Sequence, residues 1–196
     1  MASYPDLYVL RHGETKWNHQ RRWQGALDSP LTPRGLEQAA AQGHLLAQLL
    51  PERAPSAWCS PQLRARRTAE IALSFLGGEA EPDARLGEVS VGQAAGMLQS
   101  DVAARWPGFA PDADHPFGWY FRVPGSESFA ALRARCQQFL DSLNGPAIVV
   151  THGITGRMIR ALWLGLDVHG MHALPGGQGC VFQLQKNGEI VHSLKE

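Results

Sequence analysis

Hydrophobic and polar positions follow two different periods along the chain, and together they predict strands that alternate with helices. Three short, continuous apolar runs have the length of buried strands. They lie at residues 7–10, 57–59 and 147–150. Apolar residues then recur every three to four positions over residues 36–50, 65–75, 129–143 and 154–164, which is the period of amphipathic helices. This order predicts the α/β class with a largely parallel sheet.

Two features modify this picture, one at the helix starts and one at the end of the chain. Thr32-Pro33 and Ser60-Pro61 have the pattern of an N-cap residue followed by a proline in the first turn. Near the C-terminus, residues 180–185 and 189–194 flank an Asn-Gly turn and predict a β-hairpin. The hairpin would add antiparallel strands to the sheet.

Periodicity is poor over residues 86–123, where glycines and prolines interrupt the pattern. We interpret this stretch as a loop-rich lid inserted in one domain that covers residues 1–196, with a short helix near residues 100–105. Six aromatic residues lie within it, and we expect most of them to pack on the core because each buries a large apolar area. They are Trp106, Phe109, Phe117, Trp119, Tyr120 and Phe121.

Two of the predicted strands end in the same pattern, a polar residue followed by His-Gly. Arg11-His12 follows the first strand and Thr151-His152 follows the strand at residues 147–150. Parallel neighbours would bring both imidazoles to one edge of the sheet, where α/β proteins bind ligands. The glycine after each histidine would let the backbone turn and approach a ligand. A metal site fits poorly because Arg11 would repel a cation, so the pair favours an anion.

Composition limits the possible partners. Eighteen basic and eighteen acidic residues leave a net charge of zero, which argues against a nucleic-acid surface. No apolar run approaches the ~20 residues of a membrane span. The first six residues lack the features of a secretory leader, and three widely spaced cysteines fit reduced thiols, so we expect a cytoplasmic protein.

Several sequence blocks resemble those of the histidine phosphatase superfamily, the phosphoglycerate mutase-like proteins. The first block is LRHGET at residues 10–15, followed by Trp17-Asn18. Further blocks are SPQLRA at residues 60–65, LGE at 86–88, PGSES at 124–128 and VTHG at 150–153. Each block is weak alone, but their order and spacing are specific. The resemblance implies a three-layer α/β/α sandwich with a mostly parallel sheet.

The resemblance also implies roles for the polar residues of these blocks. His12 would be the nucleophile that forms a phosphohistidine, with its other ring nitrogen donating to a fixed acceptor. Arg11 and Arg64 would bind the phosphate, and a protonated His152 would add a third cation. Asn18 would contribute an amide donor. No metal and no cofactor are implied.

Glu88 matches the general acid, which would protonate the leaving alkoxide and then deprotonate the attacking water. Glu14 competes for this role because it lies close to His12 in the sequence. Substrate contacts beyond the phosphate are expected from residues near the two histidines. Besides Asn18 they are Trp23, Gln24, Gly25 and Gly153. Arg67 and residues 93–95 depart from the family pattern and could shape the pocket rim.

We therefore expect a metal-independent phosphomonoester hydrolase that acts on a small phosphorylated metabolite. The modest insertion, and Thr15 where the mutases have Ser, favour hydrolysis over the alternative, a cofactor-dependent phosphoglycerate mutase. A non-catalytic phosphate-binding module is a third class. The oligomeric state stays open, although an edge strand or the hairpin could pair two copies in a homodimer.

Overall fold

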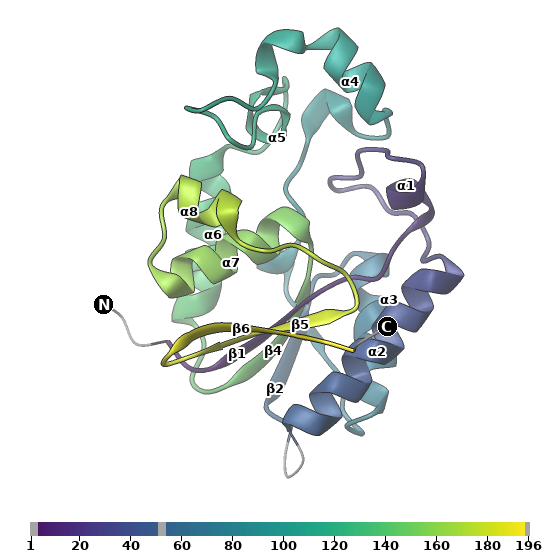
Figure 1. Ribbon diagram of the computed structural model, residues 1–196, viewed down its shortest axis with the longest axis vertical. Helices are drawn as coiled ribbons and strands as arrows, with labels where there is room; N and C mark the ends of the chain where they lie inside the picture. The colour runs from purple at the N-terminus through teal and green to yellow at the C-terminus, as the bar shows by residue number, and fades with distance from the viewer. Residues whose placement is uncertain (1–3, 51–53, 195–196) are drawn as a thin grey trace.

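The computed structural model describes residues 4–50 and 54–194, and Figure 1 shows their arrangement. Residues 1–3, which belong to the N-terminal segment predicted not to be a secretory leader, lie outside this range. Among the described residues, no helix has both the length and the hydropathy that crossing a bilayer requires.

Six strands of the described residues form one sheet in the order β3-β2-β4-β1-β5-β6. Their bounds are Leu7–Arg11 for β1, Ser56–Cys59 for β2, Glu81–Pro82 for β3, Ala147–Thr151 for β4, Cys180–Gln185 for β5 and Gly188–Ser193 for β6. Strands β3, β2, β4 and β1 are mutually parallel, and the predicted hairpin β5–β6 adds two antiparallel strands beside β1. The largely parallel sheet with an antiparallel addition is thus confirmed.

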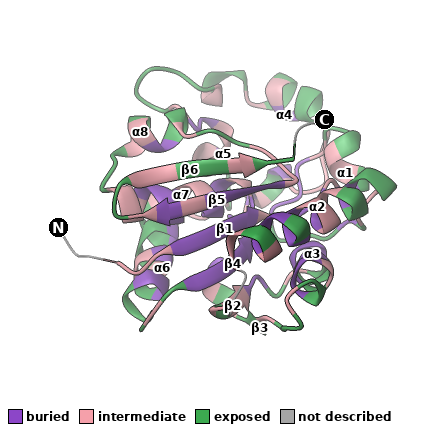
Figure 2. Cartoon of the chain, turned by 60° about the horizontal axis from the view of Figure 1, so that its bottom comes forward, coloured by how far each residue is buried: buried purple, intermediate pink, exposed green. Residues whose placement is uncertain are grey.

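Helices cover both faces of the sheet and make three layers. The first pair is α2 (Pro33–Leu49) and α3 (Leu63–Ser74), and the second is α6 (Phe129–Asp141) and α7 (Gly153–Leu164). Successive β1 side chains point to opposite faces. Tyr8 and Leu10 pack with the α2–α3 layer, while Leu7 and Val9 pack with the α6–α7 layer. Figure 2 shows β1 and β4 as the buried centre of the molecule.

One of the two predicted N-caps is correct. Thr32 caps α2, since its side chain accepts from the Gly35 amide and Pro33 occupies the first turn. Ser60 does not cap α3, which begins two residues later than the Ser-Pro pattern suggests; its N-cap is Gln62, which makes no side-chain cap bond. The buried Ser60 hydroxyl serves the second histidine instead.

The segment over residues 86–123 consists of short helical pieces joined by loops. They are η2 (Gly92–Ala94), α4 (Gln99–Arg105), η3 (Pro107–Phe109) and α5 (Trp119–Arg122), preceded by η1 (Ala84–Leu86). Helix α4 matches the short helix expected there. The sequence analysis did not predict α5, α1 (Lys16–His19) or α8 (Val168–Ala173), each too short to show a helical period. In Figure 1, α4 and α5 lie at the top of the molecule, above the sheet.

Candidate active site

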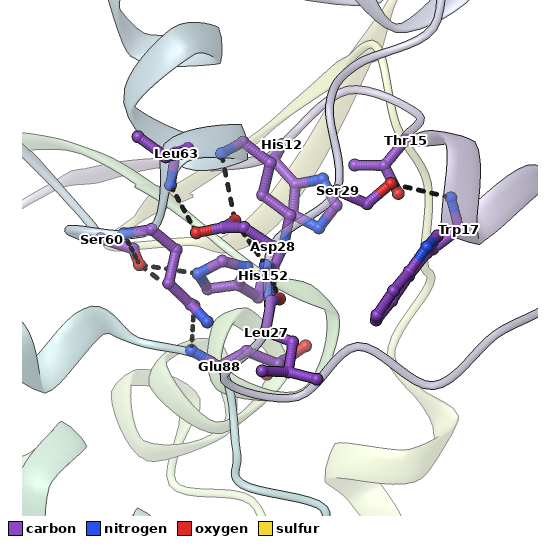
Figure 3. A network of polar contacts seen from close by, with 12 residues as sticks. His12, Thr15, Trp17, Leu27, Asp28, Ser29, Ser60, Leu63, Glu88 and His152 are labelled. Atoms are coloured by element: carbon purple, nitrogen blue, oxygen red, sulfur yellow. Dashed lines mark hydrogen bonds and ion pairs between the residues drawn. The ribbon is translucent and has the colours of Figure 1, made fainter. Parts of the chain in front are cut away.

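The two histidines meet because their strands are parallel neighbours. β1 and β4 pair in a register that sets Arg11 opposite Thr151, and the His12 amide then donates to the Thr151 carbonyl over 3.0 Å. The two imidazoles therefore follow adjacent strand ends, with ring centroids 5.2 Å apart. Figure 3 shows the rings side by side. The convergence expected from the sequence pattern is confirmed.

The surroundings of His12 fix its tautomer. Its Nδ1 lies 2.8 Å from the Gly13 carbonyl oxygen, which can only accept, so Nδ1 carries the proton and the Nε2 lone pair stays free. Burial lowers the pKa of His12 well below its usual range, and the charges of Arg64 and Arg11 lower it further. The ring is therefore neutral near pH 7, as a nucleophile requires.

His152 is equally buried but is held differently. Its Nε2 lies 2.7 Å from Ser60 Oγ, while Nδ1 has no hydrogen-bond partner among the described residues. Burial lowers the pKa of His152 well below its usual range, helped by Arg64, His12 and Arg11. This environment favours a neutral ring, so the condition for His152 to act as a third cation is not met. A neutral imidazole still offers a single N–H donor.

Arg64 is a fixed, almost fully buried cation. Its Nη1 donates to the Leu27 carbonyl over 2.7 Å and to Asp28 Oδ1 over 2.9 Å, and its Nη2 donates to the Gly25 carbonyl over 2.9 Å. Asp28 also accepts from the Leu63 amide at the start of α3 (Figure 3). The buried Nε of Arg64 has no partner among the described residues, so the Nε side of the guanidinium can donate to an anion.

Arg11 supplies a second cation beside it. Its Nε is also buried without a partner in the described part of the chain. The guanidinium lies over Gly153, where an added Cβ would be 3.4 Å from Arg11 Cζ, an ordinary van der Waals distance. Close approach requires a glycine at position 13 instead, because a Cβ there would lie 2.1 Å from the Gly35 carbonyl oxygen.

Of the two candidate carboxylates, Glu88 lines the pocket with His12 and the arginines. Its Oε1 accepts from Val89 N and Thr155 N, each at 3.1 Å, and lies near the Thr155 hydroxyl, whose single proton goes to the Gly87 carbonyl over 2.7 Å. Among the described residues Oε2 accepts one bond, from Ile154 N over 3.2 Å, so Oε2 is the less occupied oxygen. Glu14 does not line the pocket, and its carboxylate accepts from the Thr32 hydroxyl over 2.8 Å.

The amide of Asn18 is oriented by a residue that the sequence analysis missed. Asn18 Oδ1 accepts from the Thr15 amide and from Gln178 Nε2, which also donates to the His12 carbonyl over 2.9 Å. Because Oδ1 is occupied, Nδ2 is the end left for a ligand. Gln178 belongs to the loop before β5, far from every recognised block.

A cavity of about 100 Å³ lies at the carboxyl edge of β1, and the predicted site residues His152 and Gly153 are not part of its lining. Its lining includes the predicted residues Arg11, His12, Asn18, Trp23, Gln24, Gly25, Arg64 and Glu88. Tyr120 from the insertion lines it too, with its ring centroid 4.4 Å from that of Trp23. Arg67, expected at the rim, is exposed on α3 and pairs with Glu70.

The loop after α1 is bonded to the insertion, and this contact closes one side of the cavity. The Trp23 amide donates to the Met97 carbonyl over 2.9 Å, and the Gly96 amide donates to the Trp23 carbonyl over 2.7 Å. Within residues 4–50 and 54–194, no group of three His, Cys, Asp or Glu side chains could hold a metal ion. Arg11, Arg64 and Glu88 are charged residues that line the cavity with His12.

Comparison with known proteins agrees with this constellation. A model of the histidine phosphatase superfamily (branch 1) matches residues 7–193, and the chain belongs to this superfamily. Phosphoserine phosphatase 1 of Hydrogenobacter thermophilus is 32% identical over 169 residues, covering 83% of this chain and 77% of that protein. These relationships confirm the resemblance and the phosphoglycerate mutase-like fold.

Solved structures with the same fold include both phosphatases and mutases by name. A phosphoglycerate mutase from Thermus thermophilus is 32% identical with a TM-score of 0.72, and the match covers 97% of this chain and 99% of that one. A mycobacterial glucosyl-3-phosphoglycerate phosphatase, complexed with VO3, is 27% identical with a TM-score of 0.78. That match covers 96% and 98% of the two chains.

The neutral, buried histidines make stability depend on pH. In the unfolded chain both rings take up protons below about pH 6.5, whereas the folded protein resists because their pKa values are lowered. The free energy of unfolding should therefore fall on acidification below that pH, by up to about 1.4 kcal/mol per pH unit for each histidine. Urea unfolding at pH 7.5 and 5.5 measures the difference.

Replacing His12 and His152 by Gln together should flatten this dependence, and replacing the exposed His115 by Gln should leave it intact. A wild-type protein as stable at pH 5.5 as at pH 7.5 would contradict the neutral assignment.

Proposed function

We propose that the protein is a metal-independent phosphomonoesterase that works through a phosphohistidine on His12. The observation that carries the proposal is the free Nε2 of a neutral His12 in the same small cavity as Arg11 and Arg64. Both arginines keep a buried Nε–H that has no partner in residues 4–50 and 54–194. A phosphoryl group there would meet a nucleophile on one side and charge-stabilising donors around its oxygens.

The reaction would proceed as two displacements. His12 Nε2 forms a bond to phosphorus while the ester P–O bond breaks, and the departing oxygen takes a proton from Glu88. A water then attacks the phosphohistidine, giving its proton to Glu88 as the P–N bond breaks and inorganic phosphate forms. The arrangement of Glu88, with Oε1 held by two backbone amides and Oε2 by one, supports Oε2 as the oxygen that carries this proton.

Relatives named phosphatase support hydrolysis as the outcome, and those named phosphoglycerate mutase support the alternative, an isomerase. Both activities use the same phosphohistidine. Thr15 does not distinguish a phosphatase from a mutase through a substrate contact, because its buried side chain caps α1. We retain hydrolysis of a small phosphorylated metabolite, without nucleic-acid or membrane partners, and a cytoplasmic location as predictions.

A homodimer is also a prediction, for which the outer strand β6 with exposed Ile190 and Val191 offers an edge.

One assay tests the reaction class. The protein is incubated with a chromogenic aryl phosphate and, separately, with 3-phosphoglycerate plus a bisphosphate primer, in chelator and without added metal. We expect phosphate release in chelator and its loss in His12→Ala, by a factor of roughly 10⁴ or more because the covalent route is removed.

Interconversion of phosphoglycerates without net phosphate release would replace the phosphatase by the mutase. Phosphate binding without either reaction would favour the non-catalytic module. Activity that chelator abolishes, or that survives in His12→Ala, would contradict the proposed mechanism.

The role of Glu88 predicts a dependence on the leaving group. Glu88→Gln keeps the hydrogen-bonding shape but removes the transferable proton, so esters of weakly acidic alcohols should lose about 10²–10⁴-fold in kcat/KM. Aryl phosphates, whose leaving groups need no proton, should lose far less in the same steady-state comparison. Glu14→Gln serves as the matched control. Equal losses for both ester types would remove Glu88 as the acid.

A further inference from the structure

A second compartment adjoins the phosphate cavity on the side of the insertion. Trp23, Gln99 and Tyr120 line both spaces, so the two spaces adjoin at these residues. The second compartment has further apolar walls in Phe117, Trp119 and Ile154, and Arg157 of α7 lies in its lining. The insertion thus contributes a mostly aromatic wall, and α7, the helix after His152, contributes the cation Arg157.

The sizes of the two spaces assign them different parts of a ligand. The phosphate cavity holds about 100 Å³ and the second compartment about 280 Å³. An engineered apolar cavity of about 150 Å³ is enough to bind benzene. The phosphate cavity is therefore too small for a phosphoryl group together with a ring, whereas the second compartment has room for a ring-sized body and its substituents.

Arg157 has no acidic partner among the described residues, a feature that it shares with the partly buried Arg11 and Arg22 of the phosphate cavity. Arg85, Arg135 and Arg160 pair with Asp83, Glu127 and Glu189, respectively. Arg157 is half-buried, has no ion pair with a described residue, and donates from Nε to the Leu174 carbonyl over 3.3 Å.

Arg157 also lies in an electrostatically unfavourable place. Burial lowers its pKa, as do the nearby charges of Arg160 and Arg11, although an arginine remains charged in proteins. Desolvating a cation without a counter-charge costs free energy that a bound anion would offset. The position therefore suits an anionic group of a ligand.

We infer that the substrate's leaving group occupies this compartment, with a ring-sized apolar body against Phe117 and Trp119 and a carboxylate or similar anion on Arg157. This inference rests on the proposed function, since it takes the phosphate cavity to hold the reacting phosphoryl group. The insertion and α7 then select the substrate, while the strand ends perform the reaction. The substrate class is a phosphomonoester of an acidic, ring-bearing alcohol.

The anionic part is tested with ortho-, meta- and para-carboxybenzyl phosphates, each compared with the carbamoylbenzyl phosphate of the same shape. In the wild type, kcat/KM for at least one isomer should favour the carboxylate by about tenfold or more, the range of a charged hydrogen bond. Arg157→Gln should remove this preference and leave the carbamoyl esters nearly unchanged. The matched control Arg133→Gln, at an exposed position on α6, should keep it.

The apolar part is tested by comparing benzyl phosphate with ethyl phosphate, whose alcohols are similarly weak acids. Benzyl phosphate should have the higher kcat/KM, and Trp119→Leu should reduce its advantage. The inference is overturned if no isomer shows a carboxylate preference, or if the preference survives in Arg157→Gln. Equal kcat/KM values for benzyl and ethyl phosphate also overturn it.

The assay also separates this inference from the proposed function. Turnover of the neutral esters with no effect of Arg157 contradicts the inference alone, whereas no turnover of any ester contradicts the proposed function. In the latter case, calorimetric titration with the carboxybenzyl phosphates still measures binding. Tighter binding of the carboxylate than of the carbamoyl ester, lost in Arg157→Gln, supports the subsite, and equal binding overturns it.

Discussion

The parallel pairing of β1 with β4 is the constraint on which the site depends. Its register sets Arg11 beside Thr151 and so delivers His12 and His152 to adjacent positions at one edge of the sheet. A slip of one residue would exchange the faces of every side chain in β1 and disrupt both apolar layers, since Leu7 and Val9 face one and Tyr8 and Leu10 the other. Burial of the sheet thereby fixes the geometry of the two imidazoles.

The site also requires a buried cation beside two neutral imidazoles, and this cation needs hydrogen-bond partners to offset its burial. Arg64 is held by the carbonyls of Gly25 and Leu27 and by Asp28, which bind two of its nitrogens, and no described residue bonds its Nε. Burial of the two imidazoles and then the charge of Arg64 lower the pKa of both histidines, which keeps the proposed nucleophile His12 neutral. Hydrogen bonds within the protein position the cradle, so the proposed reaction would need little reorganisation of it.

The sequence predicts the parts of the fold that have long or clear patterns. The strands β1 and β4, the hairpin β5–β6 and the long helices all show their periods, and the repeated His-Gly ending places the two histidines. The short α5 and α8 show no period, so they could not be recognised. Ser60 precedes a proline and resembles an N-cap, but its partner His152 lies 92 positions away, and only the folded chain brings them together.

Two other residues, Gln178 and Arg157, were also not predicted, because their contacts join segments that are far apart in the sequence. Gln178 orients Asn18 from a loop that shares no motif with it. Arg157 carries no sequence motif, and its lack of an acidic partner among the described residues is seen only in the folded chain. The proposed selection of substrate by Arg157 thus depends on contacts between distant segments. The reaction class, by contrast, depends on the strand ends, where local patterns carry the information.

The identity of the phosphorylated residue tests the central claim most directly. The wild-type protein would be mixed with an aryl phosphate, quenched in alkali during turnover to preserve a phosphoramidate, and digested for mass spectrometry. We expect one phosphoryl group, located on His12, and none in His12→Ala. A phosphoryl group on another residue, or steady turnover with no phosphorylated protein at any quench time, would contradict the account.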